Sequence, residues 1–326
     1  MKNQLSRLVQ WAHRQQVWCY LLGLGFGAVV GLSAPAVAPV AEIAIMPMLA
    51  LLLYATFLGL PFSDFSGAFK DWKFMSSVLV LNFVVVPVVV WIVSRIVAQD
   101  HVVLVGVLCV LLTPCVDYVI VFAGLAKGDS QSLLAAAPVL MIAQLMLLPV
   151  YLWLFLGSEF IASIEFRPFV DAFLWIIVVP LVLAALTQAL AQRWQRMRVI
   201  DAAGSTLMVP LMTATLGVVV AAHIASVSNQ LGDLMLTVPV YILFAGIMVP
   251  LGSWVGRAAR LGIHQRRSLV FSGITRNSLV ILPLVLALPA EYSLTPLVVV
   301  TQTLIELLIM VLLINVMPRI IRDRSA

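Results

Sequence analysis

Long apolar runs recur along the whole chain, and each is close to the roughly 20 residues that a helix needs to cross a bilayer. We place ten spans, at about 17–39, 42–62, 75–97, 101–126, 131–157, 169–190, 206–228, 234–257, 267–289 and 295–318. With 63% hydrophobic and 10% charged residues, the composition excludes a soluble domain. Because the connections are short, residues 1–326 are predicted to form one all-α membrane domain.

Positive charge is strongly asymmetric about these spans. If the N-terminus is cytoplasmic, 16 of the 19 Lys and Arg residues fall on the cytoplasmic side, and only Arg95 and Arg167 fall outside. This split obeys the positive-inside rule, so we expect a multi-pass protein of a bacterial-type cytoplasmic (inner) membrane with both termini cytoplasmic. The net charge of +5 then reflects topology and is poor evidence for nucleic-acid binding.

The N-terminus also permits a second interpretation. Basic residues, an apolar stretch and Ala36-Val37-Ala38 together resemble a cleavable secretory signal. Cleavage would leave nine spans, and the stretch is long for a signal, so we favour a first transmembrane helix. The chain has no GxxxxGK[ST] loop, which argues against an ATP-driven pump. We expect neither an enzyme nor a bound cofactor.

Two halves of five spans each follow from the count, at about 17–157 and 169–318, joined near 160–168. Five is odd, so the second half enters the membrane from the opposite side and the halves form an inverted repeat. Helix breakers and polar residues interrupt the fourth span of each half, at Thr113–Asp117 and Ser272–Ser278. We predict that both helices break at mid-membrane and cross there, as at the substrate sites of secondary transporters. The alternative is that Gly, Ser and Pro serve only close helix packing.

Three ionisable side chains lie within spans: Asp117, Arg276 and Glu306. Asp117 and Arg276 occupy equivalent places in the two halves, and we predict that they pair, either as a structural ion pair or in gating and anion attraction. Glu306 has no intramembrane base left to balance it, so it could bind and release a coupling proton. The alternative is a protonated acid that hydrogen-bonds a neighbouring helix. Gln302 precedes Glu306 by one helical turn and could share its cavity.

Cys115 directly follows the helix-breaking Pro114. A thiol there can bind a soft metalloid transiently, although a buried cysteine usually acts as a small hydrophobe, as expected for Cys19 and Cys109. Cys109 falls on a different helix face, so no three-thiolate cage and no permanent metal site are expected.

The fourth span, with Thr113-Pro114-Cys115, Val119–Phe122 and Leu125–Asp129, resembles the arsenical-resistance permeases of the bile acid/sodium symporter superfamily. The resemblance extends to Glu306 in the last span and to Asn277 in the ninth. It implies ten helices, with spans 1, 2, 6 and 7 as a panel, spans 3–5 and 8–10 as a core, and export of arsenite-like species.

This chain departs from that family pattern at Asp117 and at Arg276. These two changes look correlated, because together they keep the core neutral.

Three functions are therefore considered. The first is proton-coupled efflux of arsenite or antimonite, which the thiol favours. The second is sodium- or proton-coupled transport of an organic anion, which a free Arg276 would favour. The third is a non-transporting membrane sensor or structural protein. The predicted substrate-binding residues are Pro114, Cys115, Arg276 and Asn277, and the predicted ion-coupling residues are Asp117, Gln302 and Glu306.

Overall fold

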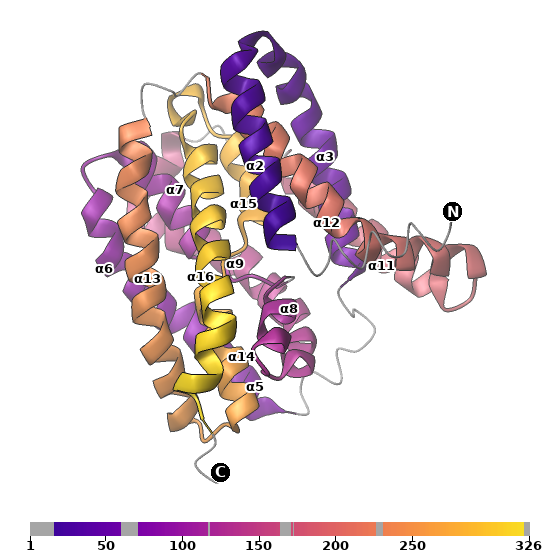
Figure 1. The fold of residues 1–326 in the computed structure, drawn as a ribbon, viewed down its shortest axis with the longest axis vertical. Coiled ribbons are helices and arrows are strands. Elements are labelled where there is room, and N and C mark those ends of the chain that lie inside the picture. The colour runs from indigo at the N-terminus through magenta and orange to yellow at the C-terminus, as the bar shows by residue number, and fades with distance from the viewer. Residues whose placement is uncertain are drawn as a thin grey trace. The chain divides into compact units, whose positions relative to one another are not determined.

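The computed structural model describes residues 16–59, 71–116, 118–163, 171, 173–225 and 231–322, and this part of the chain is helical almost throughout (Figure 1). Its elements are α2 (Gln16–Ser33), η1 (Pro35–Val37), α3 (Ala38–Leu58), α5 (Trp72–Val80), η3 (Leu81–Val85), α6 (Val86–Val93), η4 (Ser94–Val97), α7 (His101–Leu111), α8 (Tyr118–Leu125), α9 (Ser130–Ser163), η5 (Phe173–Val178), α11 (Val179–Ala191), α12 (Gln195–His223), α13 (Leu231–Ala258), α14 (Ile263–Ile274), α15 (Ser278–Leu286), η7 (Ala290–Tyr292) and α16 (Thr295–Ile320). The predicted all-α fold is confirmed.

Seven helical segments of the described residues are long and apolar enough to cross a membrane. They are Pro35–Leu58, Trp72–Val97, Ser130–Gly157, Leu174–Ala191, Thr206–His223, Leu234–Ala258 and Ala290–Ile320. Of the three other predicted spans, the first has a shorter apolar helix, Trp18–Ser33, and the fourth and ninth are interrupted. The count of ten spans and the inverted repeat stay predictions.

Some predicted boundaries are wrong for identifiable reasons. The first helix ends at Ser33, short of the predicted 39, because Pro35 opens a 3₁₀ turn. The next helix therefore begins at Ala38. The fifth span, in contrast, ends at the predicted residue 157, where Gly157 has a φ of 83°, in the left-handed region that glycine tolerates.

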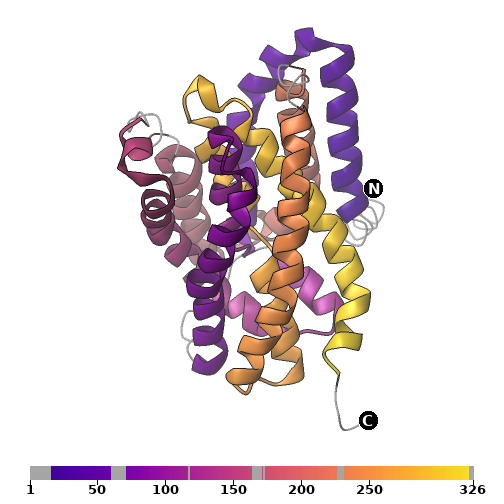
Figure 2. The same cartoon turned by 90° about the vertical axis from the view of Figure 1, so that its left-hand side faces the viewer.

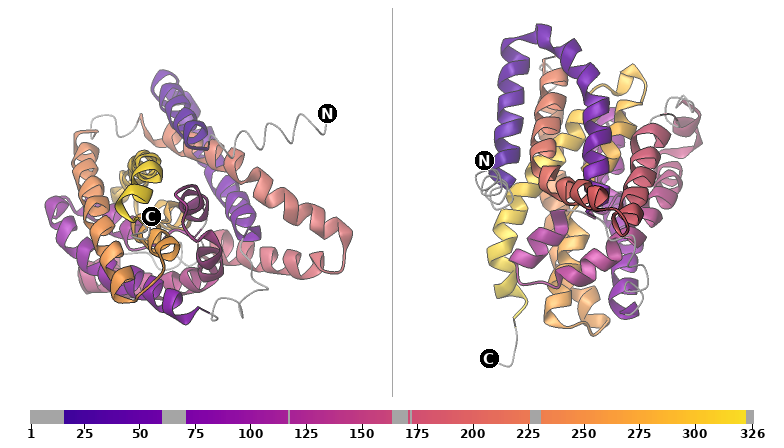
Figure 3. Two further views of the ribbon diagram at one scale, coloured as in Figure 1. Left: turned by 60° about the horizontal axis from the view of Figure 1, so that its bottom comes forward. Right: turned by 90° about the vertical axis from the view of Figure 1, so that its right-hand side faces the viewer.

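The chain divides into two compact units. Unit 1 comprises Met1–Gly59, Glu165–Gly232 and Leu282–Val300. Within it, α2 and α3 both pack against α12 (Figure 3). On the α2 side this contact, which we call the glycine seam, consists of Gly23, Gly27 and Gly31 facing Thr213, Gly217 and Ala221. A Cβ built at Gly27 would lie 2.2 Å from the Gly217 carbonyl oxygen, so only glycine permits this approach.

The contact of α2 and α3 with α12 in unit 1 is largely apolar. An apolar groove of about 470 Å³ lies among α2, α3 and α12, lined by side chains such as Phe26, Val30 and Val218. Polar contact is found between α3 and α11, where the Tyr54 and Thr187 hydroxyls lie 2.8 Å apart. Close apolar packing is therefore the main contact described between α12 and the pair α2 and α3.

Unit 2 comprises Leu60–Ile164, Asp233–Ile281 and Thr301–Ala326. Figure 2 shows α13 as one long continuous helix, in orange, although it contains Pro239 and Pro250. The shorter α14 packs against α5, α8 and α9.

The N-terminal half of α14 fastens two other segments of unit 2. Arg267, which is buried, donates from Nε and Nη2 to the Ile321 carbonyl oxygen at the end of α16, at 3.2 and 2.8 Å. Its Nη1 donates to the Lys127 carbonyl oxygen, at 3.1 Å. The Ser268 hydroxyl donates to the Asp129 carbonyl oxygen, at 2.9 Å. We call this group the Arg267 clamp.

Candidate functional site

Both segments that were predicted to break are interrupted. The first interruption separates α7 from α8 and contains Pro114, and the second separates α14 from α15. We call residues 112–116 and 275–277 the paired breaks. A proline cannot donate to the carbonyl one turn back, so the helix ends there and its last carbonyls need other donors.

The two breaks bond directly to each other through their backbones. The Cys115 N–H donates to the Thr275 carbonyl oxygen at 3.1 Å, and the Asn277 N–H donates to the Thr113 carbonyl oxygen at 2.8 Å. Pro114 and Arg276 thus form an isolated antiparallel β-bridge. Unwound backbone is tolerated at membrane depth only where protein or a cavity satisfies it, and each break satisfies part of the other.

Arg276 is fully buried at this bridge, with 0% of its side chain exposed. Its Nη2 donates to the Ser272 carbonyl oxygen at 2.7 Å and to Asn82 Oδ1 at 2.9 Å. Its Nη1 donates to the Leu111 carbonyl oxygen at 3.3 Å, one of the carbonyls freed by the first break. The guanidinium also lies 5.5 Å from the centre of the Phe244 ring. The positive charge is therefore held by neutral oxygens and an aromatic face.

Asn82 belongs to this site, and sequence reasoning missed it. It lies in the π-helical turn Leu81–Val85, a type of irregularity that is frequent at functional sites. Its Nδ2 donates to the Ser272 hydroxyl at 2.9 Å, while its Oδ1 accepts from Arg276. The available signal was a single amide within an otherwise apolar span, shortly before Pro87.

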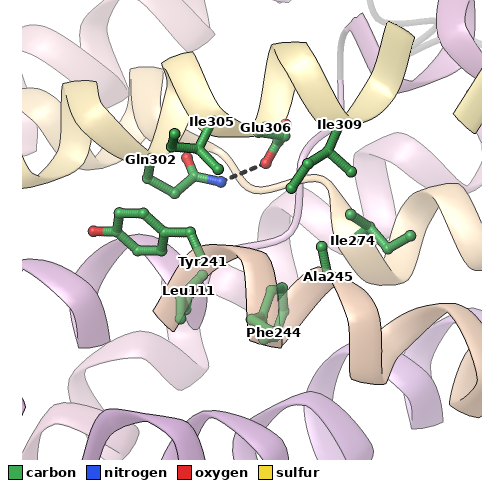
Figure 4. Close-up of a pocket in the computed structure, with 9 residues that line it drawn as sticks. All are labelled: Leu111, Tyr241, Phe244, Ala245, Ile274, Gln302, Ile305, Glu306 and Ile309. Carbon is green, nitrogen blue, oxygen red and sulfur yellow. Dashed lines mark hydrogen bonds between the residues drawn. The ribbon is translucent and has the colours of Figure 1, made fainter. Parts of the chain in front are cut away.

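Glu306 is almost fully buried, with 3% of its surface exposed, and its carboxylate accepts three hydrogen bonds. The Tyr118 hydroxyl donates to Oε1 at 2.6 Å. The backbone N–H of Arg276 donates to Oε2 at 2.8 Å, and so does Gln302 Nε2 at 2.5 Å (Figure 4). The Glu306 carboxylate on α16 is thus bonded to the second break and to Tyr118, the first residue of α8. Tyr118 was also missed, and its signal was a phenol at the start of the helix that follows the first break.

Gln302 and Glu306 line one small cavity with apolar side chains from α7, α13, α14 and α16 (Figure 4). Its volume of about 10 Å³ is close to the minimum that one water molecule needs. Gln302 Oε1 is buried and has no hydrogen-bond partner among the described residues. The same holds for Asn277 Nδ2 and Ser278 Oγ in the second break. The site therefore has unused polar atoms in addition to the bonded carboxylate.

The structure brings most of the predicted site residues together. Cys115 is fully buried in the first break, and its thiol lies close enough to Arg276 for an electrostatic interaction. Asp117 lies outside the described residues, so its pairing with Arg276 stays a prediction. Across the described part of the chain, no group of three or more His, Cys, Asp or Glu residues could hold a metal ion.

Comparison with known proteins identifies the family. A family model described as Sodium Bile acid symporter family matches residues 46–232, more than half of the chain. The match includes Cys115 and Tyr118 and stops before Arg276 and Glu306. No curated protein matches the chain. Together with its apolar helices, the match makes this an integral membrane protein, a transporter of the bile acid/sodium symporter type. The chain belongs to the Sodium Bile acid symporter family.

Proposed function

We propose that this protein is a proton-coupled secondary transporter that exports arsenite or antimonite, with Cys115 as the transient substrate ligand and Glu306 as the proton carrier. The observation that carries the proposal is the connection at the paired breaks. The backbone of Cys115 bonds to Thr275, and the next residue, Arg276, bonds to the Glu306 carboxylate. Two peptide units therefore link the soft ligand to the titratable acid.

The chemistry at Cys115 is a reversible condensation. The thiol displaces one hydroxyl of the uncharged trihydroxide, forming one sulfur–arsenic bond and releasing one water molecule. The reverse reaction with water frees the substrate and restores the thiol. One sulfur ligand gives weak binding, which suits a carrier that must release its cargo. The unpartnered polar atoms of Asn277 and Ser278 are available to the remaining hydroxyls.

The hydrogen bonds of Arg276 support a proton, not sodium, as the coupling ion, because they occupy oxygens that a sodium ion would need. A sodium ion needs several oxygen ligands. Three oxygens at the site, from Leu111, Ser272 and Asn82, already accept hydrogen bonds from the guanidinium. Glu306 itself needs only to gain and lose a proton.

Transport of an organic anion is the second candidate, and the family description favours it. The buried guanidinium would then attract the substrate carboxylate. Against this candidate, both Nη groups of Arg276 are bonded to protein oxygens and are not free to meet a substrate carboxylate.

Uptake of arsenite into everted membrane vesicles tests the proposal. We expect uptake that depends on an imposed proton gradient and does not change when sodium is removed. Sodium-dependent uptake of a bile acid, with no movement of arsenite, would establish the second candidate in its place.

Two substitutions assign the roles. Cys115→Ser should abolish arsenite uptake while the folded protein remains in the membrane, whereas Cys109→Ser, at another buried thiol, should transport normally. Glu306→Gln cannot release a proton, so gradient-driven uptake should fail while substrate binding persists. Arsenite uptake by Cys115→Ser at the parent's rate would exclude Cys115 as the substrate ligand.

A further inference from the structure

We propose that Tyr118 is a positioning residue that changes its hydrogen-bond partner when Glu306 gains a proton, and so reports the charge of Glu306 to the second break. This inference rests on the proposed role of Glu306 as the coupling carboxylate. It assigns a role to a residue that the transport proposal does not use.

The starting observation is that one hydroxyl lies within reach of two acceptors. Tyr118 Oη lies 2.6 Å from Glu306 Oε1 and 3.1 Å from the carbonyl oxygen of Arg276. A phenol carries a single proton, so it donates fully to one of these atoms at a time. With Glu306 ionised, the shorter, charge-assisted bond to Oε1 is the stronger of the two.

A proton on Glu306 reverses this choice. Oε2 already accepts from two N–H donors, Arg276 N and Gln302 Nε2, so the acid proton belongs on Oε1. There it donates to Tyr118 Oη, because a phenol oxygen accepts as well as donates. The Tyr118 proton then turns to the Arg276 carbonyl oxygen. Each heavy atom keeps its position, and each proton has an acceptor.

The consequence falls on the two peptide groups that flank the Cα atom of Arg276. Its N–H is bonded to Glu306, and its carbonyl oxygen gains a full hydrogen bond from Tyr118 only when Glu306 is protonated. Its neighbours, Thr275 and Asn277, are the residues that bond to the first break. Protonation therefore shifts the hold on the second break towards α8, because the Arg276 carbonyl oxygen gains the Tyr118 bond while the bond from the Arg276 N–H to α16 loses its charge assistance.

The groups that face Glu306 leave Tyr118 as the switching partner. On its own helix Gln302 donates to the other carboxylate oxygen, and from the second break Arg276 contributes a charge whose Nη donors are bonded elsewhere. On α13, Tyr241 lines the same cavity, but its hydroxyl bonds to Thr237 and is turned away from Glu306 in Figure 4. Cys115 interacts with Arg276.

Infrared difference spectroscopy of the reconstituted protein, acid minus neutral, tests the switch without any substrate. We expect a carboxylic-acid C=O band that Glu306→Gln removes. With ring-labelled tyrosine, a phenol C–O band should fall in frequency on acidification, because the phenol becomes an acceptor as well as a donor. Tyr118→Phe and Glu306→Gln should both remove this tyrosine band. Tyr151→Phe is the control, since it removes a hydroxyl that donates over the same 2.6 Å to the Phe83 carbonyl oxygen, outside the site.

The two proposals fail in different ways. If no acid band depends on Glu306, the coupling role itself is wrong. If the acid band is present and no tyrosine band depends on Tyr118, the switch alone is overturned.

A transport measurement with arsenite gives the functional readout. In Tyr118→Phe, gradient-driven uptake should fall about tenfold, the size of one strong hydrogen bond, while exchange at equal pH stays near the parent's rate. Equal loss of both activities, or of neither, would contradict a switching role. Tyr151→Phe should match the parent in both assays.

Discussion

The glycine seam of unit 1 and the paired breaks of unit 2 both bring two backbones into close contact, and they do so by opposite means. In the seam, α2 and α12 remain regular helices, and their carbonyls stay bonded within each helix while Gly27 lies against Gly217. In the breaks, the helices end, and the backbone bonds run from one segment to the other. The lining of the adjacent cavities also differs. The groove beside the seam is lined by apolar residues, whereas Gln302 and Glu306 line the cavity beside the breaks.

The difference shows where a membrane protein can place chemistry. A regular helix has no spare backbone groups, so the seam contributes packing and nothing that recognises a polar ligand. An interrupted helix presents carbonyls and N–H groups that must find partners, and here they hold a guanidinium and a carboxylate. We therefore expect substitutions in the two regions to lower the free energy of unfolding by different amounts.

The largest effect is expected at the breaks, from Arg276→Met. It leaves three buried oxygens without a donor, and we expect a loss of about 3 kcal/mol in the free energy of unfolding. Thermal unfolding in detergent measures it, with Arg95→Met, at an exposed arginine, as the control.

The same assay tests the predicted pair of Arg276 with Asp117. Because a lone buried charge is the costly species, Asp117→Asn combined with Arg276→Gln should lose less than the sum of the two single changes. Additive losses would exclude the pair.

The seam gives an intermediate effect and a matched control on the same helix. In Gly27→Ala the new methyl group would overlap the Gly217 carbonyl, and we expect about 1–3 kcal/mol of destabilisation from overpacking. Gly25→Ala meets nothing within 4 Å and should be neutral or slightly stabilising. Equal melting temperatures for the two variants would show that α2 does not approach α12 this closely.

The smallest effect is expected where unit 1 uses a polar contact. Tyr54→Phe removes the hydroxyl that lies 2.8 Å from Thr187, and hydrogen bonds between membrane helices average about 0.6 kcal/mol. A double-mutant cycle with Thr187→Ala isolates this term. A Tyr54–Thr187 coupling energy as large as the loss of stability in Arg276→Met would contradict the difference drawn between the two regions.

The sequence was most informative where a residue has a strong local effect. Pro114 and the polar run around Arg276 predicted both breaks, because a proline or an unpaired polar group in an apolar span disrupts it wherever it lies. Glu306 was found as a carboxylate within an apolar span, and Gln302 was found because it lies one helical turn before Glu306.

The partners of these residues depended on tertiary structure. Asn82 reaches Arg276 from a helix 194 positions away in the chain, and Tyr118 reaches Glu306 across 188 positions. No local pattern encodes such distances. The early end of the first helix, in contrast, was available from Pro35 and was overlooked because apolar residues continue beyond it.

The Arg267 clamp has a mechanical consequence for any transport cycle. One guanidinium ties the end of α16 to the loop that follows α8, and it projects from α14. At that end, α16 and α14 cannot slide past each other without breaking the two hydrogen bonds from Arg267 to the Ile321 carbonyl oxygen. Glu306 on α16 and Ser272 on α14 should therefore travel together as one stiff body. Bending is then expected at the unwound residues 275–277 at the other end of α14, which are the residues that bond to the first break and so lie beside the proposed ligand Cys115.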